Sequence, residues 1–571
     1  MSPVVFAAVV FVCYGVLHPE WFNYHEQYQL FMFGWEYLSE HVAVASGMAG
    51  YMAEFVVQFY FFPILGAVMW AGLLVLMGWL VWKVARLLDG GCSHYALCFL
   101  PPLAVALYCG DENVMMAFPM SILLALVSAF SYGKSTCSWR GWAQVAVIPL
   151  LYWIMGYGVF VYAALSLALD RRKFGYDAAR TLLMVGVYVV VISMTIVLVG
   201  HTVMKQYPFI DIVCGVNFYR ERLVVPMMQH VVAVCCVVVP VVMPLLKQSG
   251  RVVAIVEAAV MALVLPVSSS KTFDNVVYPL LKIDYLVRNQ EWAKVVKFCE
   301  QNPPTNDMGA SGLNLALAMT GQLPDRMFEF PQYGKNGLLS SFERNMVSCG
   351  ITAEACYYLG LINSVLRYNY DSQAAIVNCN MSGRFTRRIA EAYMLNGNYE
   401  LAMKYADLLK KTVFYRPWAK RVEDCCKNPA TIGQSKRWAV IMRHRLPENQ
   451  LFSVTDMDAM LLNLYKHSPD NAMALQYSLA CDLLDGKMKN FVNTMSQTFD
   501  DNSRMPRVYQ EALAWVYLQR QGTLKGVPDF ISNEVQADLR DFDRLYMMDR
   551  NNPQLRQGRL AKTFWGYTIR Q

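Results

Sequence analysis

Acidic side chains without basic neighbours lie in two short stretches of the N-terminal half of the chain. The first, HPEWFNYHEQYQLFMFGWEYL, begins at His18 and contains no Lys or Arg. The second, CGDEN, ends at Asn113. Carboxylates at the edge of an apolar region are costly unless they are solvated or paired. These acids therefore need a bound cation, a nucleophile whose proton they accept, or Lys and Arg from other loops.

Residues in both stretches are candidates for catalysis. The first stretch offers Glu26 and His25, and the second offers Asp111 and Glu112. With Asn113, the second stretch places three oxygen-bearing side chains in a row. Mg²⁺ and Mn²⁺ prefer such ligands, so the sequence predicts a divalent-cation site that can bridge a diphosphate. The competing interpretation is a plain turn in which Asp or Asn caps the next helix.

Substrate contacts are expected from other polar residues near the same predicted membrane surface. The candidate substrate-binding residues are Arg220, Arg222, Lys271, Glu54 and Tyr28. The two arginines can clamp phosphate oxygens in bidentate fashion. Arginine at a membrane surface also anchors lipid headgroups, and the acids and rings of the first stretch equally suit an interfacial helix.

The elements around these residues are mostly apolar. Of the 571 residues, 56% are hydrophobic and 16% are charged, and the mean hydropathy is +0.27. A spanning helix needs about 20 mostly apolar residues. About nine spans are predicted, at Met1–Leu17, Phe55–Val81, His94–Cys109, Val114–Phe130, Trp142–Met155, Gly158–Leu169, Thr181–Gly200, Pro226–Leu246 and Val252–Val267. The net charge of +7 comes without a basic stripe, so the sequence gives no indication of nucleic acid binding.

Basic residues are unevenly distributed between the predicted loops. One alternate set of loops is rich in Lys and Arg, whereas residues 18–54 and the CGDEN loop contain none. Lys and Arg favour the cytoplasmic side of a membrane. We therefore predict that the N-terminus is inside, and an odd number of spans then places the C-terminal half outside.

The C-terminal half has the composition of a soluble helical protein. Its stretch RRIAEAYMLNGNYELAMKYADLLKKTVFYRP spaces aromatic and small residues much as a tetratricopeptide repeat (TPR) does, and IDYLVRNQEWAKVVKFCEQNPP is a partial match. An irregular α-solenoid gives a similar pattern. We predict an all-α protein with a transmembrane domain at residues 1–270 and a soluble, TPR-like helical-repeat domain at residues 271–571.

This layout resembles the GT-C superfamily of integral-membrane glycosyltransferases. Glu26 in YHEQYQLF matches the essential acid of the first outer loop, and Asp111 and Glu112 match a second acidic motif. The chain departs from the family because the first acid is Glu rather than Asp, DEN is not Asp-x-Asp, and a WWDYG-like motif is absent. Over most of its length the chain also resembles an uncharacterised family of multi-pass Bacteroidota membrane proteins with a TPR-like C-terminal domain, through EQYQLF, YMAEFVVQFYFFPILGA and CGDEN.

The resemblance to GT-C implies transfer of a sugar from a polyprenyl-phosphate carrier to an extracytoplasmic protein or glycan. It implies a bacterial inner-membrane protein whose C-terminal domain lies in the periplasm. Glu26 would be the general base on the acceptor hydroxyl. Arg220, Arg222 or a cation at Asp111 and Glu112 would neutralise the leaving phosphate. Membrane lipid, and a protein acceptor or partner at the helical domain, are the other expected partners.

Two further classes of function fit the sequence. A membrane-anchored interaction protein would use the helical repeats to bind a partner, although nine spans exceed what anchoring needs. A transporter would need ionisable residues at mid-depth and commonly carries internal repeats, and the sequence shows few of the former and none of the latter.

Overall fold

The described residues form an all-helical protein. In a computed structural model the described residues are 3–89, 94–135, 140–221, 224–246, 255–257, 259, 263–264, 266–267, 272–340, 345–376, 380–447, 453, 455–499 and 504–570. Within these ranges the only β pairing consists of two isolated bridges, Val114 with Tyr219 and Tyr333 with Lys335. The predicted all-α class is confirmed.

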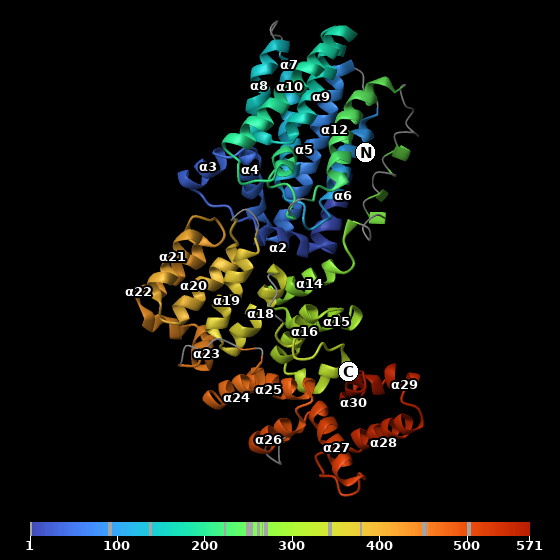
Figure 1. The fold of residues 1–571 in the computed structure, drawn as a ribbon, viewed down its shortest axis with the longest axis vertical. Helices are drawn as coiled ribbons and strands as arrows, with labels where there is room; N and C mark the ends of the chain where they lie inside the picture. The colour runs from blue at the N-terminus through green and yellow to red at the C-terminus, as the bar shows by residue number, and fades with distance from the viewer. Residues whose placement is uncertain are drawn as a thin grey trace. The chain divides into compact units, whose positions relative to one another are not determined.

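The chain divides into two compact units (Figure 1). Unit 1 contains residues 1–278 together with two short segments from the C-terminal half, 377–383 and 408–417. Unit 2 contains residues 279–376, 384–407 and 418–571. The sequence predicted one division near residue 270, and it did not indicate that later segments return to unit 1.

Unit 1 is built around a bundle of long helices, in which α5, α7, α9, α10 and α12 run side by side (Figure 1). Its helices are α1 (Pro3–Val10), η1 (Phe11–Leu17), α2 (Pro19–Gln27), α3 (Trp35–Val42), α4 (Gly47–Val57), η2 (Gln58–Phe61), α5 (Pro63–Asp89), η3 (Tyr95–Phe99), α6 (Leu100–Tyr108), α7 (Ala117–Lys134), α8 (Arg140–Met155), α9 (Gly158–Lys173), α10 (Ala178–Thr202), α11 (Phe209–Cys214), α12 (Met227–Val242) and η4 (Met243–Leu245).

Four helices of the described residues are long and apolar enough to cross a membrane. They are Pro63–Leu88, Ala117–Lys134, Ala178–Thr202 and Met227–Leu245. The pair Pro3–Leu17 and Pro19–Gln27, bent by 75°, makes a fifth if it is one span. The other described apolar helices are too short for this length test: Tyr95–Tyr108 and Trp142–Met155 are close to the predicted segments, and α9 follows α8 after a turn at Gly156 (φ 58°), where the sequence also placed a break. Half of the predicted span Val252–Val267 lies outside the described residues.

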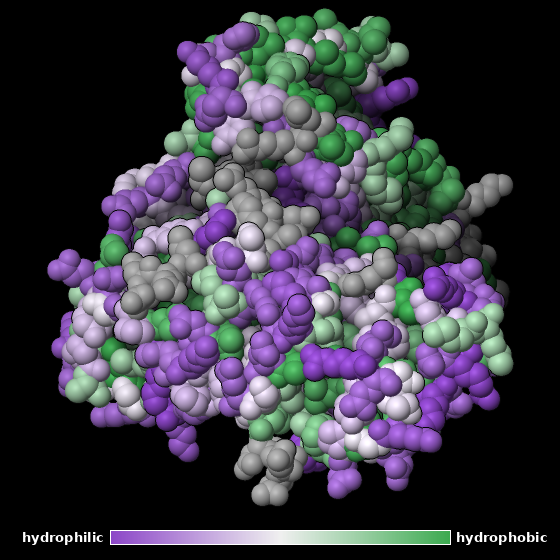
Figure 2. Space-filling model, turned by 60° about the horizontal axis from the view of Figure 1, so that its bottom comes forward, coloured by the Kyte–Doolittle hydropathy of each residue, from purple (hydrophilic) through white to green (hydrophobic). Residues whose placement is uncertain are grey.

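The outer surface of unit 1 is apolar in a way that suits lipid. In α10 only 28% of the most apolar 18-residue window is buried, and Leu182, Val189 and Met194 are among its exposed side chains. An exposed apolar surface of this extent is unusual for a protein in water. Figure 2 shows the contrast between the mainly hydrophobic surface of unit 1 and the mixed, largely hydrophilic surface of unit 2.

Unit 2 is a succession of short helices that pack as neighbouring pairs, such as α18 with α19 and α24 with α25. The predicted repeat RRIAEAYMLNGNYELAMKYADLLKKTVFYRP begins inside α20 and continues through α21 into α22, and Gly397 forms the α20–α21 turn with φ 81°. Its helices, including those that begin or end in unit 1, are α14 (Val277–Arg288), α15 (Trp292–Gln301), α16 (Asp307–Met319), α17 (Leu323–Arg326), η5 (Met327–Glu329), α18 (Met346–Leu359), α19 (Ile362–Ala374), α20 (Gly383–Leu395), α21 (Tyr399–Lys410), α22 (Arg416–Lys427), η7 (Pro429–Gln434), α23 (Lys436–His444), α24 (Met457–His467), α25 (Ala472–Leu484), α26 (Met488–Thr498), α27 (Arg507–Gln521), α28 (Asn533–Met548), α29 (Pro553–Arg556), η8 (Leu560–Lys562) and α30 (Phe564–Thr568).

Candidate functional site

The CGDEN loop joins α6 to α7 and pairs with a distant segment of unit 1. The backbone N–H of Arg220 donates to the carbonyl of Asn113 (2.8 Å), and the N–H of Met115 donates to the carbonyl of Phe218 (3.0 Å). These two bonds flank the antiparallel bridge between Val114 and Tyr219. Backbone pairing therefore fixes Arg220 beside the acidic loop, although about 107 positions separate them in the chain.

Side chains reinforce this pairing. The hydroxyl of Tyr219 donates to Asp111 Oδ2 (2.9 Å), and Arg220 Nε donates to Asn113 Oδ1 (3.0 Å). Asn113 Nδ2 in turn donates to Asp111 Oδ1 (3.1 Å) and to Glu112 Oε1 (3.0 Å). Asp111 thus has a hydrogen bond at both carboxylate oxygens, which makes it part of the frame of the loop.

Helix α2 contributes one face to the same place. Positions 24, 25 and 28 are neighbours on a helix surface. The hydroxyl of Tyr28 donates to the carbonyl of Glu112 (3.0 Å) and lies 2.8 Å from His25 Nδ1, and Arg220 Nη1 donates to the hydroxyl of Tyr24. We call this group the Arg220 cluster; its members are Tyr24, His25, Tyr28, Asp111, Glu112, Asn113, Tyr219 and Arg220.

The backbone beneath the Arg220 cluster is held by large side chains. Trp21 Nε1 donates to the carbonyl of Cys109 (2.7 Å), and the hydroxyl of Tyr278 donates to the carbonyl of Gly110 (2.6 Å). A Cβ atom at Gly110 would lie 2.0 Å from the side chain of Thr272. Only glycine therefore fits at this position, and the acidic loop is rigid before any ligand arrives.

Glu112 is the acid of the cluster whose environment favours proton transfer. Its side chain is only partly buried. Burial raises the pKa of the Glu112 carboxyl, and the charge of Asp111 adds to this, while Arg220 opposes it. A raised pKa makes a carboxylate a stronger base near neutral pH. Its position next to a guanidinium is an arrangement typical of functional sites.

The predicted metal ligands do not form a cation site in this arrangement. Asn113 Oδ1 accepts from Arg220, so the amide turns its N–H donors toward Asp111 and Glu112, where a cation would need oxygen. Within the described residues, no group of three or more His, Cys, Asp and Glu side chains lies close enough to hold a metal ion.

Glu26, which the sequence predicted as the catalytic base, has a different environment. It is 3% exposed and accepts a hydrogen bond from the hydroxyl of Tyr415 (2.7 Å). Tyr415 belongs to the segment 408–417 of unit 1, and a Cβ atom at Gly383 would lie 2.3 Å from its ring. The structure therefore brings His25 and Tyr28, rather than Glu26, to the acidic loop, and Glu26 fixes α2 against the returning segments.

Glu54 lies in a second polar group, with Tyr37 and His41. Its Oε2 accepts from the Tyr37 hydroxyl and is 2.9 Å from His41 Nε2. Burial alone would lower the pKa of His41, but the hydrogen bond and charge of Glu54 outweigh it and raise this pKa. Glu54 is thus paired with a histidine and is not a member of the Arg220 cluster.

Two predicted residues, Arg222 and Lys271, lie outside the described residues. The structure adds residues that sequence analysis missed. They are Tyr24, Tyr219, Tyr278 and Tyr415. Tyr24 could have been found because it lies four positions before Tyr28, on the face that contains His25. Tyr415 could not, because its stretch had been assigned to a helical repeat.

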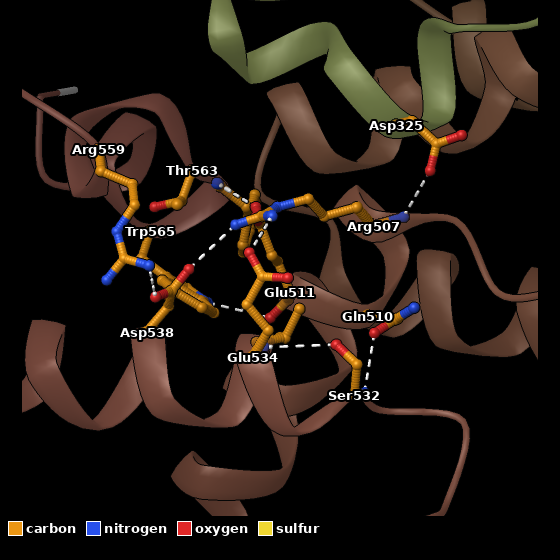
Figure 3. Close-up of polar contacts among 12 residues, drawn as sticks. Asp325, Arg507, Gln510, Glu511, Ser532, Glu534, Asp538, Arg559, Thr563 and Trp565 are labelled. Carbon is orange, nitrogen blue, oxygen red and sulfur yellow. Dashed lines mark hydrogen bonds and ion pairs between the residues drawn. The ribbon is translucent and has the colours of Figure 1, made fainter.

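Unit 2 contains ionisable clusters of a different kind, in which acids are paired with arginine. In Figure 3, Arg507 bridges Glu511 (3.1 Å) and Asp538 (3.0 Å), and Arg559 also binds Asp538 (2.6 Å). The N–H of Phe564 donates to Glu511 Oε2 (2.9 Å). These bonds tie the C-terminal residues to α27 and α28, so the cluster has a structural role in the fold of unit 2.

Comparisons with known proteins give one match. A family model described as a family of unknown function (DUF6057) matches residues 1–570. No curated protein and no solved structure matches the chain.

Proposed function

The chain belongs to DUF6057, a family of unknown function, and we propose that it is a membrane glycosyltransferase of GT-C type. It transfers a sugar from a polyprenyl-phosphate carrier to an extracytoplasmic protein or glycan. One observation carries this proposal: α2, the CGDEN loop and the segment around Arg220 converge, so that the Glu112 carboxyl interacts electrostatically with the Arg220 guanidinium.

Arg220 suits the binding of the donor phosphate. Its Nε and Nη1 bind Asn113 and Tyr24, which orient the guanidinium. The guanidinium carbon Cζ lies 5.6 Å from the centroid of the Tyr24 ring. Nη2 forms no hydrogen bond with the described residues, so its donors remain for a ligand oxygen. A guanidinium fixed in this way stabilises charge that develops on a leaving phosphate without reorganising.

Glu112 suits the role of general base. The acceptor hydroxyl attacks the anomeric carbon and its proton passes to the Glu112 carboxylate. The bond between the anomeric carbon and the phosphate oxygen breaks, and the electron pair leaves with the lipid phosphate beside Arg220. His25 and Tyr28 position the backbone of Glu112, and Glu26 acts through α2 instead of on the substrate.

The same proposal includes a location. The N-terminus lies inside, the Arg220 cluster faces the periplasm, and the TPR-like unit 2 lies in the periplasm of a bacterium, beyond about nine crossings of the inner membrane. The uneven distribution of Lys and Arg between loops supports this orientation. Unit 2 would then present an acceptor protein or a partner enzyme.

Glycan profiles of cells test the proposal. Cells that lack the protein are complemented with the wild type, Glu112→Gln, Arg220→Met or the control Glu36→Gln, whose carboxylate is exposed on α3. We expect the control to restore the missing glycan and the Glu112 variant to lower transfer by about 10²–10⁴-fold. Full restoration by Glu112→Gln, at equal protein level, would contradict the role of the base.

A further inference from the structure

A cavity opens in unit 1, beside the polar group of Glu54. Its volume is about 220 Å³. Its walls come from three parts of the chain: residues 30–47, which include α3, the connections on either side of α11, and the segment that contains Asn380 and Met381. We call it the headgroup pocket. It is smaller than the roughly 300–1,000 Å³ pockets of drug-sized ligands, so it suits a single ring.

One wall of the headgroup pocket is fixed by the Tyr37–Glu54–His41 group. His41 Nδ1 lies 2.9 Å from the carbonyl of Tyr37, which can only accept, and Nε2 lies 2.9 Å from the Glu54 carboxylate. Both ring nitrogens therefore donate, and the positive charge of His41 cancels the negative charge of Glu54. This wall presents a rigid, neutral surface to a ligand.

Two polar groups at the headgroup pocket remain open to a ligand. The Nδ2 atom of Asn380 is buried and has no hydrogen-bond partner among the described residues. Glu40 stands at the exposed rim and forms no hydrogen bond with the described part of the chain. A buried donor without a partner costs about 1–3 kcal/mol, which a ligand can recover.

These two groups select the chemistry of the ligand. A phosphate would accept from Asn380 but would be repelled by Glu40. An ammonium would bind Glu40 but cannot accept from Asn380. A hydroxyl both donates and accepts, so neighbouring hydroxyls of one ring satisfy both groups.

Exposed apolar residues flank the headgroup pocket on two sides. Phe33 and Trp35 precede its α3 wall and are 44% and 79% exposed. Val203 and Phe209 flank its second wall and are 44% and 61% exposed. Large exposed apolar side chains beside a polar cavity indicate contact with lipid chains.

We propose that the headgroup pocket binds a neutral polyhydroxylated ring, a sugar, carried on a lipid. Asn380 donates to one ring hydroxyl and Glu40 accepts from another, while the lipid chain lies along the flanking apolar residues. The site is distinct from the Arg220 cluster, and its test measures binding. It therefore stands or falls separately from the proposed transfer reaction.

Photo-cross-linking of the full chain in phosphatidylglycerol nanodiscs tests the site. The probes are octyl β-glucoside and octyl β-galactoside with a diazirine in the chain, and the reference probe carries phosphocholine on the same chain. We expect at least one glycoside to label peptides containing residues 37–47 or 204–217, and phosphocholine to label them weakly. A methyl glycoside should compete only at higher concentration than the octyl glycoside, because the lipid chain contributes to binding.

Variants make the test specific. Asn380→Leu and Glu40→Gln should each weaken labelling affinity about 5–10-fold, as expected for one lost hydrogen bond. Glu36→Gln, on the same helix as Glu40 but 87% exposed and not lining the cavity, should label like the wild type. The proposal is wrong if neither glycoside labels these peptides, if phosphocholine labels them equally, or if both pocket variants bind like the wild type. If the methyl glycoside competed at the same concentration as the octyl glycoside, the ligand would be a free sugar, and the proposal that a lipid carries it would be wrong.

Discussion

The buried acids of the two units are stabilised by different partners. In unit 2, Arg388 binds Glu354 and Glu391 at 2.5 Å each, and both acids are almost fully buried. Burial alone would raise the pKa of Glu391, but the charges of Arg388 and Arg437 hold it at about 2. In unit 1, Glu26 is bound by the phenol of Tyr415, and Asp111 by a phenol and an amide.

This difference separates two ways of stabilising a buried acid, by a cation or by neutral hydrogen-bond donors. Glu391, which is paired with arginine, has a lowered pKa and stays ionised over the whole physiological range. Unit 1 thus holds Glu26 and Asp111 with neutral donors, whereas unit 2 pairs Glu354 and Glu391 with Arg388.

Loss of the central arginine in unit 2 should have the largest effect. Arg388→Met leaves two buried carboxylates without their main cation, and we expect the free energy of unfolding to fall by about 3–5 kcal/mol. Pulse proteolysis of the full chain in detergent measures this through cleavage in unit 2. The control Lys427→Met breaks an exposed pair with Glu423 and should cost at most about 0.5 kcal/mol. Similar losses for both variants would remove the distinction between buried and exposed pairs.

A buried acid of unit 2 without an arginine partner should have the opposite effect of pH on stability from an acid paired with arginine. Asp482 is 2% exposed; burial, followed by the charge of Asp458, raises its pKa to about 7. Because this folded value exceeds the roughly 3.9 of an unfolded Asp, the contribution of Asp482 to stability is full below pH 3.9 and is lost as pH rises to about 7.

Asp482→Asn should therefore stabilise the protein at pH 8, by on the order of 2–4 kcal/mol, and have little effect near pH 4. Denaturant unfolding of the full chain at both pH values measures the difference. Asp529→Asn, at an exposed position, is the control and should not change the pH dependence. A gain of equal size at both pH values would show that charge is not the cause.

The phenol that holds Glu26 should matter less than an arginine, because a neutral partner contributes one hydrogen bond. Tyr415→Phe keeps the ring and leaves Glu26 buried without this donor, which should cost about 1–3 kcal/mol. Unfolding of the full chain in mixed detergent micelles measures this cost. Tyr517→Phe removes a hydroxyl that binds an exposed carbonyl, that of Gly526, and should be nearly neutral. No loss on Tyr415→Phe would mean that Glu26 is not held in this way.

The smallest effect is expected at the edge of the cluster in Figure 3. Glu534 is 65% exposed, although it lies 2.9 Å from Arg507. Glu534→Gln should change stability by at most about 0.5 kcal/mol, because solvent screens an exposed ion pair. Asp538→Asn, at the 1% exposed partner of the same arginine, is the matched comparison and should cost more. Thermal unfolding of both variants at one ionic strength tests the order.

The sequence predicted the features that depend on local pattern. Apolar runs located the helices of unit 1, and the loop that contains Asp111 and Glu112, which the sequence singled out, contacts Arg220 through Asn113. The break at Gly156 was also predicted, between the segments Trp142–Met155 and Gly158–Leu169, and α8 ends and α9 begins there. The function itself remains a prediction.

Long-range contacts could not be predicted in this way. Tyr415 lies 389 positions from Glu26, and nothing in the local sequence around either residue indicates that the two are in contact. The His41–Glu54 pair depends on how α3 packs against α4, and the orientation of the Asn113 amide depends on Arg220. Each of these contacts involves an acid that the sequence offered as a candidate site residue.

The return of two late segments to unit 1 means that this unit is not encoded by one continuous stretch of the gene. A fragment that stops at residue 278 would lack the segments 377–383 and 408–417, and with them the phenol that satisfies Glu26. Cloning the N-terminal half alone would thus yield an incomplete membrane body.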